Sequence, residues 1–195
     1  MATIDFDSSY LGVPPWDIGG PQPEIARLAD RGEIQGDVLD VGCGTGENAI
    51  YLSRLGRRVV GIDSSSNAIK KAEARAEQLE VDVTFLVEDA LELHTLNRIF
   101  DSIIDSGLFH GLTDDGRLRF TKSLLSVLAI RGKYFMICFS DEEPKDWGGP
   151  RRITKAEIRE TFQLGWKIDY INEGLFKTNI HDNGGKAWIS SITKT

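Results

Sequence analysis

The sequence lacks any hydrophobic run long enough to cross a membrane. No apolar stretch in the 195 residues approaches the roughly 20 that a membrane-spanning helix needs. The first residues are acidic and contain no apolar segment typical of a secretory signal, so we expect a cytoplasmic protein with no membrane partner. Hydrophobic residues still make up 41% of the chain, which is enough for a sizeable core.

Basic residues, cysteines and histidines are also scarce. The chain has 23 Lys and Arg against 30 Asp and Glu, a net charge of −7, which argues against a nucleic-acid partner because such a partner needs a basic face. Cys43 and Cys138 are the only cysteines, and we interpret both as small buried hydrophobes rather than a disulfide. The three histidines show no paired spacing of metal ligands, so no metal site is expected.

Four of the six prolines, together with three glycines, lie in the first 23 residues, which therefore cannot form a long regular element. We interpret residues 1–23 as an arm or lid and residues 24–195 as a single domain. Strands are predicted over 37–41, 58–62, 83–87, 101–105, 133–139, 165–172 and 186–193. Helices are predicted over 24–30, 47–55, from 64–66 onward, 114–129 and 155–163, and a short helix or turn over 91–96. Five strand–helix repeats thus end in an antiparallel hairpin whose turn is at 182–185.

The most informative stretch is Val-Leu-Asp-Val-Gly-Cys-Gly-Thr-Gly at residues 38–46. An apolar strand enters a loop with glycine at every second position, a helix follows, and Asp63 ends the next strand. This is the layout of a nucleotide-cofactor site on a parallel sheet. The N–H groups at the start of the helix favour an anion, and the carboxylate of Asp63 suits the two hydroxyls of a ribose.

Two cofactors compete for this loop. A dinucleotide site has the pattern G-x-G-x-x-G, and its third glycine would fall on Glu47, whose carboxylate would repel a pyrophosphate. A ligand with one carboxylate and one cationic centre, such as S-adenosylmethionine (SAM), fits the loop better. An NAD-type oxidoreductase remains the alternative, as does a tight turn that binds no ligand.

Residues 38–46 resemble motif I of class I SAM-dependent methyltransferases. The resemblance implies an α/β fold with a seven-stranded, mostly parallel Rossmann-like sheet, helices on both faces and a C-terminal antiparallel hairpin. It implies that Asp63 binds the ribose, that Asp89 and Ala90 contact the adenine, and that Asp105 lies at the active-site edge. The cofactor-binding residues predicted in this way are Trp16, Asp40, Gly42, Cys43, Gly44, Gly46, Asp63, Ser64, Asp89, Ala90 and Asp105.

A second resemblance concerns the arm. Pro-Pro-Trp-Asp-Ile-Gly-Gly-Pro-Gln-Pro at residues 14–23 is similar to a segment of halide/thiol methyltransferases, which are relatives of the thiopurine methyltransferases. In that family the segment covers the cofactor, which implies that Trp16 lies against the methionine end of SAM. The resemblance also implies a small-molecule acceptor.

The acceptor itself is not settled by the sequence. His110 follows the strand over 101–105, at the edge where ligands of open α/β sheets bind. It is a candidate general base, or a residue that only shapes the pocket. Asp105 is the second candidate catalytic residue, which could orient the acceptor or the methionine amine.

We therefore predict a SAM-dependent methyltransferase that acts on an oxygen, sulfur or nitrogen nucleophile of a thiol, phenol, quinol or halide-like acceptor. Besides the oxidoreductase, a non-catalytic SAM-binding module is the alternative. We expect a monomer or homodimer.

Overall fold

The computed structural model describes residues 6–144 and 149–195. Residues 1–5 of the predicted arm and 145–148 of the loop before the last helix lie outside the described residues. The strands are β1 (Asp37–Val41), β2 (Arg58–Asp63), β3 (Thr84–Val87), β4 (Phe100–Ser106), β5 (Leu128–Phe139), β6 (Trp166–Phe176) and β7 (Gly185–Lys194). The α-helices are α1 (Phe6–Ser9), α2 (Pro23–Asp30), α3 (Glu47–Arg54), α4 (Ser66–Gln78), α5 (Asp114–Val127) and α6 (Lys155–Thr161). The 3-10 helices are η1 (Ala90–Leu96) and η2 (Phe109–Gly111).

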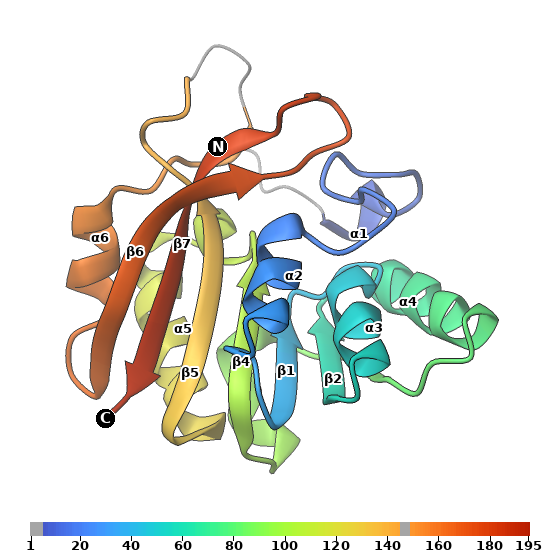
Figure 1. Ribbon diagram of the computed structural model, residues 1–195, viewed down its shortest axis with the longest axis horizontal. Coiled ribbons are helices and arrows are strands. Elements are labelled where there is room, and N and C mark those ends of the chain that lie inside the picture. Colours follow the sequence, from blue (N-terminus) through green and yellow to red (C-terminus); the bar gives the residue numbers. More distant parts are fainter. Residues whose placement is uncertain (1–5, 145–148) are drawn as a thin grey trace.

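The seven strands form one sheet in the order β3-β2-β1-β4-β5-β7-β6. β1 pairs parallel with β2 and β4, whereas β7 pairs antiparallel with both β5 and β6. The predicted fold is confirmed: a mostly parallel sheet ends in an antiparallel hairpin, and Figure 1 shows helices on both of its faces.

Each face of the sheet has its own core because successive side chains of a strand point to opposite faces. On β1, Val38 joins the cluster that contains Ile50 of α3, while Leu39 joins the cluster that contains Phe120 of α5. In Figure 1, α2 and α3 lie in front of the sheet and α5 lies behind it. Helices on both faces leave only the edges of the sheet open to ligands.

α5 packs on the sheet through one face. Phe120 and Leu124 are fully buried and Thr121 is 6% exposed, whereas Leu118 is 52% exposed. The helix predicted over 114–129 ends at Val127, because Leu128 already belongs to β5.

The carboxyl ends of the strands meet at one edge of the sheet, because β1, β2 and β4 are parallel. β6 runs in the same direction as β5, since both are antiparallel to β7. Asp63 of β2, Ser106 of β4 and Phe176 of β6 therefore end at the same edge. The N-terminal arm and the loop between β6 and β7 lie above this edge (Figure 1).

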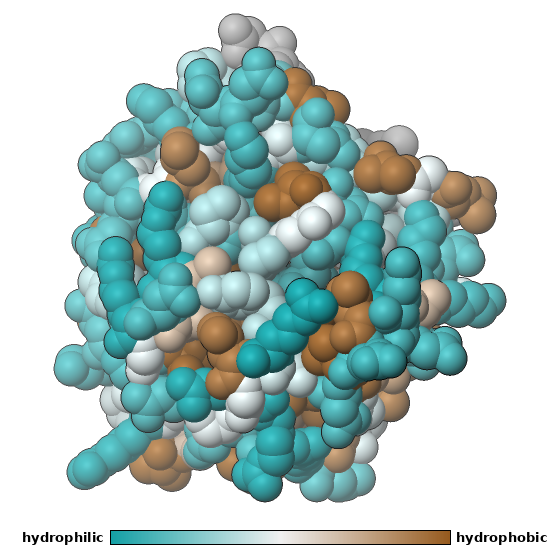
Figure 2. Space-filling view, turned by 45° about the vertical axis from the view of Figure 1, so that its right-hand side comes forward, coloured by the Kyte–Doolittle hydropathy of each residue, from teal (hydrophilic) through white to brown (hydrophobic). Residues whose placement is uncertain are grey.

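The helices in the described part of the chain do not meet the needs of a membrane-spanning helix. None of the helices within residues 6–144 and 149–195 is long and apolar enough to cross a bilayer. On the face shown in Figure 2, hydrophobic residues form separate small islands on a mainly hydrophilic surface.

Candidate active site

The glycine loop between β1 and α3 depends on backbone conformations that favour glycine. Gly42, Gly44 and Gly46 have φ values of 68°, 55° and 82°, all in the left-handed region. A Cβ on Gly42 would lie 3.2 Å from Leu108, and a Cβ on Gly46 would lie 2.6 Å from Phe85. Packing therefore requires Gly46, whereas Gly42 lets the segment after β4 come against the loop.

Several N–H groups of this loop are already used inside the protein. Cys43 donates to the carbonyl of Ile62 at 2.8 Å, and Gly46 donates to the carbonyl of Cys43 at 3.0 Å. Gly44 donates to Oδ2 of Asp63 at 2.9 Å. These three N–H groups are therefore not available to a ligand, and the anion position predicted at the start of α3 stays a prediction.

Asp63 links the glycine loop to the start of α4. Besides the N–H of Gly44, it accepts a hydrogen bond from the N–H of Ser65 at 2.9 Å. Burial raises the pKa of Asp63, and hydrogen bonds from backbone N–H groups act against this. A carboxylate offers about four lone-pair sites, so this one retains acceptor capacity for a ligand. Ser64 lies beside it and is exposed.

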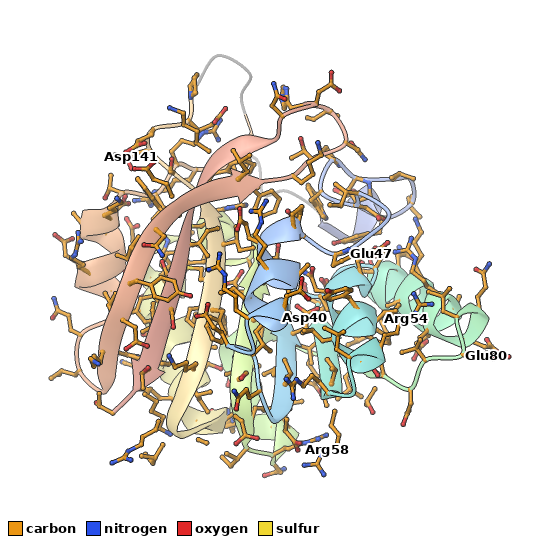
Figure 3. The ribbon with its side chains drawn as sticks, in the orientation of Figure 1. Asp40, Glu47, Arg54, Arg58, Glu80 and Asp141 are labelled. Atoms are coloured by element: carbon orange, nitrogen blue, oxygen red, sulfur yellow. The ribbon has the colours of Figure 1, made fainter. Side chains whose placement is uncertain are left out.

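Asp40 is a buried carboxylate that no donor satisfies. The residue is 1% exposed, and within the described residues neither Oδ1 nor Oδ2 has a hydrogen-bond partner. Burial, followed by the charges of Asp105 and Asp63, raises its pKa to about 8, although the nearby backbone N–H of Ala49, which forms no full hydrogen bond, acts in the opposite direction. Figure 3 labels it on β1, next to α3, whose first residue is Glu47. Because burying an unpaired carboxylate is costly, this position is suited to a cationic ligand.

Glu47 does not repel an anion as strongly as the sequence suggests. Its carboxylate pairs with the guanidinium of Arg75, which also donates to Oγ1 of Thr45 at 3.1 Å. Arg75 lies 3.9 Å from Asp17 of the arm as well. The argument against a diphosphate from the charge of Glu47 is therefore weaker than predicted, because a neighbouring cation offsets that charge.

The N-terminal arm brings two aromatic side chains to the glycine loop. The indole N–H of Trp16 donates to the hydroxyl of Tyr10 at 2.9 Å, and the rings meet edge to face with centroids 6.1 Å apart. A Cβ on Gly44 would lie 2.8 Å from the same hydroxyl. Tyr10 is 4% exposed. It is a site residue that sequence reasoning missed, because one aromatic in a Pro- and Gly-rich segment gives no periodic signal.

Hydrogen bonds fasten this arm at both ends. Near its start, Oδ1 of Asp7 accepts from the hydroxyl of Ser65 at 2.6 Å, beside Asp63. Near its end, Gln22 exchanges two hydrogen bonds of 2.9 Å with the backbone of Lys177. Between them, the side-chain amide of Asn179 donates to the carbonyls of Pro14 and Asp17. The arm thus spans from α4 to the loop between β6 and β7.

The predicted adenine-contacting segment lies beside the end of β2. The N–H of Glu88 donates to the carbonyl of Asp63 at 3.1 Å. Asp89 is exposed and caps η1, where its Oδ1 accepts from the N–H of Leu91 at 2.8 Å. Ala90 begins η1. Asp63, Asp89 and Ala90 are therefore grouped, and their roles toward adenosine stay a prediction.

Asp105 is not available to a ligand, which corrects its predicted roles in catalysis and cofactor binding. It is fully buried. It accepts hydrogen bonds from the N–H groups of Leu108 at 2.8 Å and Phe109 at 3.1 Å, and from the hydroxyl of Tyr134 at 2.7 Å. Burial raises its pKa to about 7. The geometry makes Asp105 the residue that fixes the turn leading to His110.

His110 is at the predicted edge, but its surroundings do not suit a general base. Its Nδ1 accepts a hydrogen bond from the N–H of Phe139 at 3.2 Å, so the lone pair on that nitrogen is occupied. The residue is 8% exposed. Burial, together with the positive charges of Arg152 and Arg117, lowers its pKa to about 3. A neutral imidazole in this arrangement carries its hydrogen on Nε2.

Aromatic rings enclose His110. Phe139 stacks on it at 5.1 Å between ring centroids, and Phe176 lies 5.7 Å away. The guanidinium of Arg152 lies 5.2 Å from the ring centroid of Phe139. Sequence reasoning missed Phe176 because the strand was predicted to end at 172, whereas β6 continues to Phe176. This half of the edge is therefore apolar, in contrast to the acidic half around Asp40.

Comparison with known proteins gives consistent results. Residues 38–132 match the family model described as "Methyltransferase domain". The chain is 36% identical over 184 residues to the 2-heptyl-1-hydroxyquinolin-4(1H)-one methyltransferase of Mycobacteroides abscessus, with 89% of this chain and 81% of the relative covered. It is 28% identical to thiocyanate methyltransferase 1 of Brassica oleracea, with 83% and 73% covered.

Solved structures share the same fold. One, described as "Conversion of a Disulfide Bond into a Thioacetal Group during Echinomycin Biosynthesis", has a TM-score of 0.89 and 32% identity, covering 100% of this chain and 92% of that chain. A magnesium protoporphyrin IX methyltransferase from Synechocystis, solved with bound SAM, has a TM-score of 0.67 and 22% identity, covering 88% and 76%.

Proposed function

The chain belongs to the class I SAM-dependent methyltransferases, and from this premise we propose that the edge described above binds SAM through Asp40 and Asp63 and a small organic acceptor beside His110. The reaction is methylation of a nucleophilic oxygen, sulfur or nitrogen atom of that acceptor.

The unpartnered carboxylate of Asp40 carries this proposal. It is buried next to the glycine loop with no donor among the described residues. An ammonium group satisfies such a carboxylate both by charge and by hydrogen bonding, and SAM carries one at its methionine end. The nicotinamide ring of NAD has no ammonium group, and the nitrogen that is positively charged in its oxidised form has no hydrogen to donate, so Asp40 favours SAM over NAD.

Other residues are proposed to bind the ribose, the adenine and the sulfonium end of SAM. Asp63 retains acceptor capacity for the ribose hydroxyls, and the neighbouring Asp89 and Ala90 lie where the adenine would end. Trp16, held by Tyr10 above Gly44, covers the sulfonium end, where a cation–π contact contributes about 0.5–2 kcal/mol. In this proposal residues 1–23 act as a cover and residues 24–195 as the catalytic domain.

SAM supplies a methyl group on a positively charged sulfur, which an acceptor takes by in-line displacement. The task of the protein is to align the two reactants and to keep water out. Positioning contributes up to roughly 7–11 kcal/mol in intramolecular models. Here the close approach of Leu108 to Gly42 brings the acceptor segment against the cofactor loop. The arm, tied to the loop between β6 and β7, closes the edge from above.

The names of the relatives support acidic, compact acceptors. They act on a hydroxyquinolone and on thiocyanate. The aromatic surroundings of His110 suit a planar or apolar molecule of this kind. The net charge of −7 supports the further proposal that no nucleic acid is a partner. A cytoplasmic location and a monomeric or homodimeric state are also proposed.

A radiolabelled methyl-transfer screen over thiols, thiocyanate, hydroxyquinolones, phenols and quinols tests this function. We expect label in the organic product of at least one of the acidic acceptors. SAM binding without transfer to any member of the panel would favour a non-catalytic SAM-binding module instead.

A further inference from the structure

The hydrogen bonding of His110 determines which of its nitrogens can meet a ligand. Nδ1 accepts from the N–H of Phe139, so the hydrogen of the neutral ring is on Nε2. Among the described residues no group accepts a hydrogen bond from Nε2. The ring thus has one donor to offer and no lone pair with which to take a proton.

In the described part of the chain, the charged groups that act on His110 are both cations, Arg152 and Arg117. β5 and β6 face it with Phe139 and Phe176, which do not titrate. Within residues 6–144 and 149–195, no carboxylate is recorded as acting on the ring, and Asp105 is occupied by its own three donors. This surrounding favours negative charge on a ligand beside His110 and disfavours a positive charge on the ring.

The turn after β4 brings His110 close to the cofactor loop. The turn that carries it is fixed by Asp105, and its Leu108 lies against Gly42 of the cofactor loop. A Cβ on Gly107 would lie 3.3 Å from Cε1 of His110 and 3.0 Å from the ring of Phe176. A side chain at position 107 would therefore fill the space between the imidazole of His110 and the ring of Phe176.

We propose that His110 donates a hydrogen bond from Nε2 to the nucleophilic atom of the acceptor, and that the natural acceptors are apolar or aromatic molecules whose oxygen or sulfur is already ionised when it binds. This inference rests on the proposed function and names its substrate class. The thiolate or oxyanion attacks the methyl carbon with its own electron pair. The carbon–sulfur bond of SAM breaks, its pair stays on sulfur as a neutral thioether, and no proton moves to the protein.

Two acceptors with one skeleton and different acidity test this directly. 4-Nitrothiophenol is a stronger acid than 4-methoxythiophenol, and kcat/KM is measured for each across a pH range. We expect the inflection of each profile to follow the ionisation of that thiol, and so to differ between the two. An inflection common to both thiols would identify a protein base and overturn the inference.

Substitutions separate a donor from a base. His110→Gln keeps an N–H near the position of Nε2, so kcat/KM for the ionised nitrothiol is expected to stay within about threefold of wild type, whereas His110→Phe is expected to lower it about 10- to 100-fold, as for one lost hydrogen bond to a charged group. His94→Gln, a change at an exposed histidine of η1, is the matched control. Calorimetric SAM affinity confirms that each variant is folded.

Equal losses in His110→Gln and His110→Phe, with SAM affinity intact, would contradict the donor role. A failure of the proposed function looks different. Wild-type protein that binds SAM and methylates no acceptor contradicts the proposed function, and with it this inference.

Discussion

At the scale of single residues, three aspartates at one sheet edge differ in their hydrogen bonding. Asp105 is satisfied by three donors, Asp63 by two backbone N–H groups, and Asp40 by none within the described residues. The number of hydrogen-bond donors distinguishes a carboxylate with a structural role from one that can bind a ligand. It cannot be read from the sequence, where all three residues simply lie in or at the end of a strand.

Asp40→Asn is expected to stabilise the ligand-free protein, increasingly so as pH rises. The folded pKa of about 8 exceeds the unfolded value of about 3.9, so the folded state binds more protons and wild-type stability falls between these two pH values. Asp40→Asn does not lose stability in this way. The difference between its Tm and that of wild type should therefore increase from about pH 5 to about pH 8, by about 2–4 °C for each kcal/mol of stability that wild type loses. A Tm difference independent of pH would show that the carboxylate is not buried without a partner.

Tyr134→Phe is expected to impair catalysis by loosening the turn that carries His110. The lost hydrogen bond to Asp105 costs about 1–3 kcal/mol because it leaves a buried acceptor less satisfied. We expect a lower kcat with nearly unchanged SAM affinity, measured by steady-state kinetics and calorimetry. Tyr51→Phe, which removes an exposed hydrogen bond to Asp30, is the control. If Tyr134→Phe and Tyr51→Phe had the same kcat, the proposal that Asp105 positions the turn carrying His110 would be contradicted.

At the scale of elements, periodicity predicted the layers but not the connections that build the site. β1 appears with the predicted bounds, and α3 and β2 each differ from them by one residue at the C-terminal end, since alternating apolar strands and capped helices give clear local signals. The arm gave no such signal. Its hydrogen bonds to Ser65, Lys177 and Asn179 join positions far apart in the sequence, which no local pattern encodes.

Asn179→Ala is expected to weaken SAM binding by about tenfold, because two hydrogen bonds of about 0.5–1.5 kcal/mol each hold the arm over the site. The variant lies outside the cofactor loop, so the effect reports on the arm alone. Asn172→Ala, at an exposed position of β6, serves as the matched control. Calorimetry gives the affinities, and limited proteolysis should cut the arm faster in Asn179→Ala. Unchanged affinity and unchanged cleavage would show that the arm does not depend on this contact.

At the scale of the whole molecule, the sheet order divides the carboxyl edge into two chemical halves. β1 and β2 contribute the acids that suit a cation and a ribose, while β5 and β6 contribute the aromatic rings around His110. β4 lies between β1 and β5, and its turn joins the halves where Leu108 lies against Gly42. A cationic methyl donor and an apolar anion are thereby brought to one point.

Calorimetric titration of SAM into wild-type protein and Asp40→Asn, in two buffers of different ionisation enthalpy near neutral pH, tests the central claim most directly. A ligand cation pulls the buried carboxyl into its charged form, so wild-type binding should release a proton. Asp40→Asn should bind more weakly, and its enthalpy should not depend on the buffer. Equal affinity in both proteins, without proton release, would contradict the assignment of Asp40 to SAM.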